Sequence, residues 1–346
     1  MGAGPLAKPV ENKVTSLEVA ARAGVSQSAV SRVFSGASAS AETRAKVRAA
    51  ADALGYRPNV IARSLITGRS KIIGLVVAYL DNPFYPDAIE RLSNSLQERG
   101  YHIMMFMMRN QDAEEVERVF EALMSHGVDG IVAASLGMSD VLTKRCADAG
   151  VPVVLFNRGQ EGQGLGQVVS TNRAGGALAA RAFVDAGHQR IGMITGWMGS
   201  STGRDRRDGF VNQLLEMGAA LAAERDGLYE REAAANAAQS MVEEHHVDAI
   251  FVGNDHMAMA AMDMLRGQMG LSVPNDVAII GFDDVPMAAW PSYDLTTLRQ
   301  PVNRMVAAVV KQLLARIEDT DSAGQRVEIN VELKRRSSTR AVQGEF

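Results

Sequence analysis

TSLEVAARAGVSQSAVSRVF, residues 15–34, reads as two short helices separated by one glycine. Thr15 and Glu18 have the T-x-x-E spacing of a capping box, in which each side chain satisfies an orphan backbone N–H of the other residue. This spacing predicts a first helix over residues 16–23. Gly24 follows and can end that helix in the left-handed conformation.

Two more helices are predicted in the same segment. Ser26 can cap a helix over residues 27–34, and apolar residues at three- and four-residue steps indicate another over residues 41–54. Two short helices joined by a tight turn, with a third to close a small core, form a helix-turn-helix. We therefore expect residues 14–57 to form a DNA-binding domain.

The charge distribution agrees with a head that binds DNA. Residues 1–70 hold ten Lys and Arg against four Asp and Glu, a net charge of +6, whereas the whole chain carries −4. The remainder therefore carries −10. A basic head on an acidic body can meet phosphates while the body repels them.

Polar residues of the second helix can read base edges in the major groove. Gln27 can pair with adenine and Arg32 with guanine, and Ser28 lies beside them. Hydroxyls at or near helix starts can hold phosphates, and this set contains Thr15, Ser26, Ser31, Ser40 and Thr43. N-capping is an equally compatible role for Thr15, Ser26 and Ser40.

After residue 71, apolar segments alternate with amphipathic helices, which is typical of parallel sheets covered on both faces. The alternation restarts after GQGLGQ (162–167), so we expect an α/β core of two such subdomains over residues 71–340. Crossings are expected near residues 165, 295 and 326. The N-subdomain would then contain residues 71–165 plus 296–325, and the C-subdomain 166–295 plus 326–340. One of the expected strands in the second cycle is DGLY (226–229).

Two such subdomains enclose a cleft, and open α/β sheets bind ligands at the carboxyl ends of their strands. Asp283 suits vicinal hydroxyls, and Arg204 can pair with hydroxyls or with a ligand carboxylate. The cleft candidates are Tyr79, Phe84, Tyr85, Ser135, Asn157, Arg204, Tyr229, Asn254, Asp255 and Asp283. Capping of a following turn is the alternative role for Asp283.

Several other features point to ordinary structural roles. The segment IMMFMM (103–108) and the methionines at 257, 259, 262 and 264 are expected to pack in the core, although some of the latter could line a subunit interface. A single cysteine, Cys146, excludes an internal disulfide. No export signal or apolar run of membrane-spanning length is recognisable, so we expect a cytoplasmic protein.

An enzyme is the first alternative. GSSTG (199–203) matches the G-x-S-x-G of a hydrolase, with Ser201 as nucleophile, but it lies in a polar loop past its strand. No histidine follows Asp283, although an acid before the histidines at 245, 246 or 256 would restore the order. No P-loop occurs, GLGQVV lacks the third glycine of a dinucleotide fingerprint, and the adjacent His245 and His246 would point different ways from a helix, which disfavours a metal site. We expect no enzyme activity, cofactor or metal.

A periplasmic sugar-binding protein is the second alternative, because the expected body would suit one. The basic head and the absence of a recognisable signal peptide count against it. Salt-dependent binding to duplex DNA would separate the two interpretations, since a transport protein would show none.

Four segments carry a resemblance to a known family. TSLEVAARAGVSQSAVSRVFSG (15–36), ETRAKVRAAADALGYRPNVIARSL (42–65), GNDHMAMAAM (253–262) and GFDD (281–284) resemble the lactose-repressor (LacI) family of bacterial transcription regulators. The similarity runs from about residue 14 to residue 340. It implies a DNA-reading head in front of a sugar-sensing core of two periplasmic-binding-protein-like subdomains.

The resemblance implies roles for the segment between head and core. Residues 58–70 match the hinge helix and linker, and Tyr56 and Asn59 match positions that contact the DNA backbone. Leu65 matches a leucine that two paired hinge helices insert into the minor groove, which kinks the duplex. Ala62 is small, as close approach to the groove floor requires.

The resemblance also implies that Arg204 and Asp283 hold sugar hydroxyls. Asn157 stands where the family often has aspartate, and Ala29 where it usually has threonine, so a phosphate contact would be missing there. We expect a homodimer on a pseudo-palindromic operator, because two recognition helices need two half-sites. No heptad helix follows the core, so a coiled-coil tetramer is not indicated. The effector could be a hexose, pentose, sugar acid or nucleobase, and either sign of its effect on DNA binding is open.

Overall fold

The computed structural model describes residues 14–35, 38–57, 68–108, 112–135, 138–161, 164–319 and 322–340. The chain divides into two compact units, residues 1–70 and residues 71–346. In the described residues, no helix is long and apolar enough to cross a membrane.

The first unit is a three-helix head made of α1 (Ser16–Ala23), α2 (Gln27–Ser35) and α3 (Ala41–Leu54). The capping box predicted at the start of α1 is present: Glu18 N donates to Thr15 Oγ1, and Thr15 N donates to Glu18 Oε2. Gly24 ends α1 with φ 67°, a conformation that costs glycine nothing. The helix-turn-helix predicted from the sequence therefore has the expected helices and turn.

The head has its own small core of valines and alanines. Val19, Val30 and Val47, one from each helix, are almost fully buried and pack in one cluster. Phe34 and Tyr56 close its edge with ring centroids 5.7 Å apart. Ala29 of α2 is also buried, so it does not face solvent.

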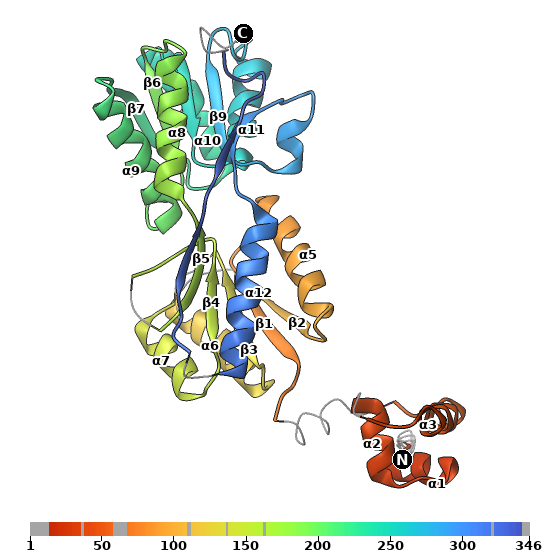
Figure 1. Ribbon diagram of the computed structural model, residues 1–346. Helices are drawn as coiled ribbons and strands as arrows, with labels where there is room; N and C mark the ends of the chain where they lie inside the picture. Colours follow the sequence, from red (N-terminus) through yellow and green to blue (C-terminus); the bar gives the residue numbers. More distant parts are fainter. Residues whose placement is uncertain are drawn as a thin grey trace, which may run out of the picture. The chain divides into compact units, whose positions relative to one another are not determined.

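The second unit consists of two α/β lobes, which Figure 1 shows one above the other. Lobe 1 has a six-stranded sheet in the order β11-β5-β4-β3-β1-β2, in which every pairing is parallel. Its strands are β1 (Ile72–Val77), β2 (His102–Met107), β3 (Gly130–Ala134), β4 (Val153–Phe156), β5 (Gly166–Ser170) and β11 (Arg326–Ile329). Its helices are α5 (Phe84–Gln97), α6 (Ala113–Ser125), α7 (Asp140–Asp148) and α12 (Val302–Glu318).

Lobe 2 repeats this architecture with the order β12-β10-β9-β8-β6-β7, parallel except for the antiparallel pair β10 and β12. Its strands are β6 (Ile191–Thr195), β7 (Leu221–Asp226), β8 (Ala249–Val252), β9 (Ala278–Asp283), β10 (Thr296–Arg299) and β12 (Glu332–Lys334). Its helices are α8 (Asn172–Asp185), α9 (Ser201–Glu216), α10 (Arg231–His245) and α11 (Asp255–Asp263), with η1 (Met264–Gln268) and η2 (Pro286–Ala289).

The three crossings between lobes fall a few residues later than the sequence suggested. β5 pairs with β4 in lobe 1, β10 pairs with β9 in lobe 2, and β11 pairs with β5 in lobe 1. The crossings therefore follow Ser170, Arg299 and Ile329. The expected boundaries at residues 165, 295 and 326 were wrong because β5, β10 and β11 each still pair within one lobe. The chain crosses to the other lobe only after each of these strands ends.

Two strand interpretations also need correction. The strand before α10 is Leu221–Asp226, and DGLY instead forms a turn in which Leu228 N donates to Asp226 Oδ1. The segment IMMFMM lies largely in β2 at the edge of its sheet, where Met105 is 47% exposed and Met107 43% exposed. Core packing, the expected role, holds for Met108 but not for those two. The methionines of α11 and its extension are buried, as expected.

Candidate functional site

The first group of candidate residues lies on the exposed surface of the head. Gln27, Ser28 and Arg32 are exposed on α2, while the opposite side of that helix is buried. Arg32 Nε donates to the Ser28 carbonyl within the helix, and Gln27 Nε2 donates to Ser16 Oγ of α1. The exposed side of α2 therefore offers the amide oxygen of Gln27 from its first turn and the terminal guanidinium nitrogens of Arg32 from its last turn.

Hydroxyl-bearing residues surround this surface. Thr15 and Ser40 cap α1 and α3 through their side chains, and Ser26 Oγ accepts from Ala29 N. All three stay exposed, as does Ser31, whereas Thr43 and Tyr56 are half-buried. The capping role proposed for the first three hydroxyls is confirmed, and it leaves them at the surface. Asn59, Ala62 and Leu65 lie outside the described residues.

The second group gathers where strands of lobe 1 end. Asn157 follows β4 and donates from Nδ2 to the Tyr85 hydroxyl at 3.0 Å. Tyr85 and Tyr79 stand edge to face with centroids 5.3 Å apart, and burial together with Tyr85 raises the pKa of the Tyr79 hydroxyl. Asn157 Oδ1 and the buried Ser135 Oγ have no hydrogen-bond partner among the described residues. The predicted residues of lobe 1 therefore form one cluster with spare polar atoms.

Arg158, which sequence reasoning did not identify, links this cluster to lobe 2. Its guanidinium carbon lies 5.7 Å from the ring centroids of both Trp197 and Tyr229. Tyr229 in turn shares a hydrogen bond of 2.9 Å with Thr202 at the start of α9. A second link joins Gly159 N, the donor, to Ser201 Oγ at 3.0 Å. We call Tyr79, Tyr85, Ser135, Asn157, Arg158, Trp197, Thr202 and Tyr229 the inter-lobe cluster.

Asp283 ends β9 and lies at the second polar centre between the lobes. It accepts from Asn82 Nδ2 of lobe 1 at 3.0 Å and from Gln300 Nε2 at 2.7 Å. Arg206 approaches the same carboxylate at 3.7 Å, with its guanidinium stacked on the Phe282 ring. Burial raises the pKa of Asp283, while Arg206 and the two amide donors act in the opposite direction.

The structure corrects one predicted site residue. Arg204 is exposed, and its Nη1 donates to the carbonyls of Met198 and Gly199 just before α9. Arg206 occupies the position that was expected for Arg204. It is 2% exposed and donates to Asn172 Oδ1 and to the Gly253 carbonyl. Two positions on a helix are separated by about 200°, so only one of these side chains can face the site.

Three further candidates are fully buried but serve mainly the fold. Phe84 stacks on Phe156 in the core of lobe 1. Asn254 caps α11 through Oδ1, although its Nδ2 has no partner among the described residues. Asp255 accepts from Thr297 Oγ1 and Val285 N within lobe 2, and burial raises its pKa to about 7. Asp255 therefore holds strand ends together behind Asp283.

Backbone conformation marks the same positions. Ser135, Asn157, Tyr229 and Asp283 all have positive φ, at 66°, 70°, 63° and 128°. Side-chain-bearing residues rarely adopt such angles, and those that do often cluster at ligand sites because the surrounding structure enforces them. Four of the predicted ligand residues thus share a strained backbone at the ends of their strands or in the turn after β7.

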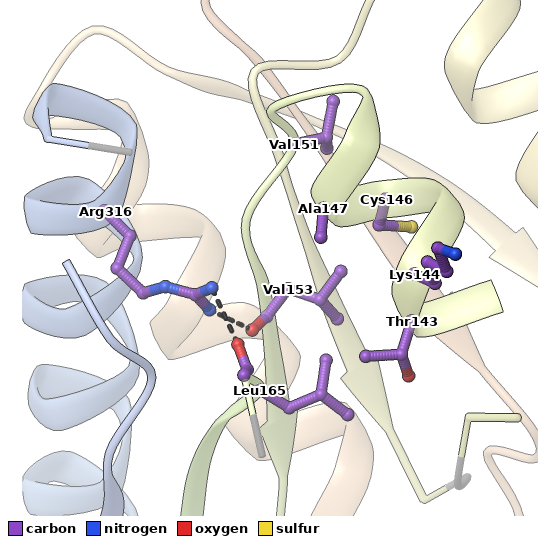
Figure 2. A pocket seen from close by; sticks show the side chains of 9 residues that line it. Thr143, Lys144, Cys146, Ala147, Val151, Val153, Leu165 and Arg316 are labelled. Atoms are coloured by element: carbon purple, nitrogen blue, oxygen red, sulfur yellow. Dashed lines mark hydrogen bonds between the residues drawn. The ribbon is translucent and has the colours of Figure 1, made fainter. Parts of the chain in front are cut away.

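The other candidates for chemistry do not form a site. Ser201 lies in the first turn of α9, and no histidine hydrogen-bonds to it among the residues described. A pocket of about 320 Å³ opens beside α7, where Arg316 donates to the carbonyls of Val153 and Gly164 (Figure 2). This pocket lies at the amino end of β4, whereas the inter-lobe cluster lies past its carboxyl end. Burial raises the pKa of Cys146 on its wall to about 11, so that thiol stays protonated.

Comparisons with known proteins cover most of the chain. Residues 16–59 match the model of bacterial regulatory proteins of the lacI family, and residues 180–339 match that of a periplasmic binding protein-like domain. The HTH-type transcriptional repressor PurR of Photobacterium profundum is 32% identical over 331 residues, which cover 94% of this chain and 98% of that protein. PurR of Serratia proteamaculans is also 32% identical, over 94% of this chain and 96% of its own.

Solved structures give the same picture. The Lac repressor dimer bound to operator and the anti-inducer ONPF has a TM-score of 0.85 at 27% identity, covering 95% of this chain and all of that one. The complex of the transcriptional regulator CelR with cellobiose has a TM-score of 0.72 at 30% identity, covering 94% of this chain and all of that one.

Proposed function

The chain belongs to the lacI family of bacterial regulatory proteins, and from this membership we propose that it binds a pseudo-palindromic operator as a homodimer under the control of a sugar-like effector. Its similarity to transcriptional repressors makes it a DNA-binding regulator and not an enzyme. The observation that carries the proposal is the pairing of an exposed reading helix with a strained polar cluster between two lobes.

DNA reading is assigned to α2. Gln27, Ser28 and Arg32 project from its exposed side, and the terminal nitrogens of Arg32 match the two acceptors of guanine. Thr15, Ser26, Ser31, Ser40 and Thr43 would contact phosphates, with Tyr56 and Asn59 beside them. Ala62 and Leu65 would reach the minor groove from the hinge. One head reads one half-site, so a two-fold dimer is needed for a palindrome.

Selection from a library of random duplexes tests this assignment whatever the operator sequence is. The purified wild-type chain should enrich inverted repeats, and its affinity should fall steeply with salt. Arg32→Ala should lose the guanine preference and about 1–3 kcal/mol of discrimination. Arg48→Ala, on exposed α3, is the matched control and should keep the sequence preference. Enrichment of the same repeats by Arg32→Ala would remove Arg32 from base reading.

Effector binding is assigned to the space between the lobes. Asp283 and Arg206 would hold hydroxyls on one side, and Asn157, Ser135 and the tyrosines on the other. Support comes from the buried polar atoms without partners and from the four strained strand-end residues. The similar regulator CelR was solved with cellobiose, which favours a sugar or sugar derivative here.

Thermal-shift screening against sugars and sugar acids tests the assignment, because a ligand that binds only the folded chain raises Tm. Asp283→Asn should lose the shift caused by any hit. Arg204→Ala should retain it, since the exposed Arg204 side chain donates to the carbonyls of Met198 and Gly199. An unchanged shift in Asp283→Asn would place the effector elsewhere.

A further inference from the structure

Arg158 is a buried cation without an anionic partner. Arg158 is only 6% exposed, and its Nε has no hydrogen-bond partner in the described part of the chain. Among the residues that the structure describes, no carboxylate forms an ion pair with it. Burying a charge is costly unless it is paired and hydrogen-bonded. The guanidinium of Arg158 can therefore still bind an anion.

The groups around Arg158 do not supply that anion. Trp197 and Tyr229 present ring systems at 5.7 Å, within the range of cation–π attraction, but neither ring carries a negative charge. Tyr79, the other nearby side chain, has its phenol pKa raised by burial, so it stays neutral at physiological pH. The lining is thus aromatic and uncharged apart from the guanidinium.

The carboxylates of the other polar centre are already committed. Asp283 is engaged by Arg206, Asn82 and Gln300, and both oxygens of Asp255 accept hydrogen bonds within lobe 2. The Asp283–Arg206 pair is neutral as a unit. Among the described residues, neither carboxylate therefore pairs with Arg158.

Two partnerless polar atoms extend the site from Arg158. Ser135 Oγ and Asn157 Oδ1 are buried, and Asn157 directly precedes Arg158 in the chain. A hydroxyl and an amide oxygen are suited to neutral hydroxyl groups and would not themselves hold an anion. A ligand that satisfies all three residues needs both an anionic group and hydroxyls.

We propose that the effector carries an anionic group, a carboxylate or a phosphate ester, which the guanidinium of Arg158 binds while its hydroxyls meet Asn157 and Ser135. The chemical class is a sugar acid or a sugar phosphate. This inference rests on the proposed sensing function of the same site. A planar guanidinium forms paired hydrogen bonds with either kind of anion, so geometry on the protein side does not favour one.

A first experiment uses inorganic phosphate as the probe and does not require the effector to be identified. At constant ionic strength set with chloride, phosphate at tens of millimolar should raise the Tm of the full chain by about 1–3 °C. Arg158→Met and Arg158→Gln should show no phosphate-specific shift, and Arg158→Lys should keep part of it. Arg204→Ala, which removes an exposed arginine, is the matched control and should respond like the wild type.

Arg158→Met also reports on the charge itself. Removing an uncompensated buried cation should leave the Tm without phosphate equal to or above that of the wild type. Equal phosphate shifts in the wild type and both neutral variants would overturn the proposal. So would a binding preference for chloride over phosphate in the wild type.

A second experiment distinguishes a carboxylate from a phosphate ester, and it tests the anion inference separately from the proposed sensing function. D-glucose, D-gluconate and D-glucose 6-phosphate share one scaffold, and calorimetry on the full chain should show tighter binding of gluconate or of the phosphate than of glucose, by tenfold or more. Arg158→Gln should abolish that difference. If a neutral sugar instead binds best, retains its affinity in Arg158→Gln and loses it in Asp283→Asn, the anion inference falls while the sensing function stands. If Asp283→Asn changes no binding event at all, both fall.

Discussion

Arg204 and Arg206 lie two positions apart on α9, yet their surroundings differ completely. Arg206→Ala would leave the buried carboxylate of Asp283 without its cationic neighbour. We expect a loss of about 2–5 kcal/mol in the free energy of unfolding, together with loss of any effector-induced Tm shift. Arg204→Ala should cost about 1 kcal/mol or less. Urea denaturation of both variants measures the difference, and equal costs would contradict the role given to Arg206.

Some of the candidate residues could be predicted from their position at the carboxyl ends of strands. This reasoning named Tyr85, Ser135, Asn157 and Asp283, which lie in the two polar centres between the lobes, because each follows or faces the carboxyl end of a strand that the apolar pattern reveals. Arg206 escaped it because that side chain comes from a helix. A helical signal was present: Gly203, Arg206 and Gly209 recur at three-residue steps and share the buried side of α9.

Arg158, Asn82 and Gln300 escaped for a different reason. Each is polar and adjacent to a residue or motif with a more obvious role, and nothing in its local sequence says which lobe it will touch. Asn82 Oδ1 accepts locally from Phe84 N, but the contact of Asn82 with the site comes from Asp283, 201 positions away in the chain. Such pairings depend on how two lobes meet, which local periodicity does not encode.

Asp255 gives the stability of the core a defined pH dependence. Its folded-state pKa of about 7 lies above the ordinary 3.8, so the folded chain keeps a proton that the unfolded chain releases. Between about pH 4 and pH 7 the free energy of unfolding should therefore fall as pH rises, and the contribution should level off above pH 7. Asp255→Asn should flatten this slope.

Chemical denaturation at several pH values between 5 and 8 measures the slope in both chains. The raised pKa of Asp283 acts in the same direction, so a reduced slope is expected in the variant and not a zero slope. A slope that is unchanged in Asp255→Asn would show that this carboxyl does not hold the proton.

At the scale of elements, α8 and α9 are held in close contact by glycines. A Cβ at Gly209 would overlap the backbone carbonyl of Arg173, and one at Gly176 would overlap that of Arg206. Gly209→Ala must push the helices apart, and we expect a loss of about 3 kcal/mol or more, since overpacking against backbone relaxes poorly. It should also weaken effector binding, because α8 and α9 carry Asn172 and Arg206.

Gly267→Ala is the matched control for that prediction. A Cβ at Gly267 meets nothing within 4 Å, and its φ is not in the left-handed region. This variant should be neutral or more stable by up to about 1 kcal/mol. Thermal unfolding of both variants decides the point, and a Gly209→Ala chain as stable as the wild type would show that the helices can separate at little cost.

Most elements were predictable because they have strong local signals. The head has a capping box and two helix-ending glycines, and the central strands of both sheets are short apolar runs. β10, β11 and β12 were not recognised as strands, since RVEI and ELK are polar and pair only at sheet edges or beside the crossings. DGLY was misread as a strand because Leu228 and Tyr229 form an apolar pair, whereas the true edge strand β7 ends in charged residues.

At the scale of the whole molecule, the division at residue 70 predicts separable activities. A chain of residues 71–346 retains both sheets and the entire inter-lobe cluster. We expect it to show the same ligand-induced Tm shift as the full chain and no sequence-specific DNA binding. Thermal shift and fluorescence anisotropy with a selected duplex measure the two. Loss of the ligand response on truncation would mean that the head contributes to the effector site.

The crossings connect the proposed effector site to the joint between the lobes. Ser170 Oγ donates to Gln300 Oε1, and Gln300 Nε2 donates to Asp283, so the first two crossings meet at the carboxylate. Gln300→Ala should reduce the effector-induced change in operator affinity, typically about 1–3 kcal/mol in such systems, while operator affinity without effector changes little. Operator titrations with and without the effector measure this coupling. Coupling equal to that of the wild type would exclude Gln300 from the transmission.

Thr171 Oγ1 also accepts from Val331 N, so all three passages of the chain are tied to one another where they run between the lobes (Figure 1). A single linker would let the two halves swivel, roll and drift apart. Three crossings that lie together restrict twisting and separation of the lobes. Bending about an axis through the crossings remains as the motion of lowest energy. A ligand that contacts both lobes should therefore change mainly one quantity, the bending angle between them, whatever the shape of that ligand.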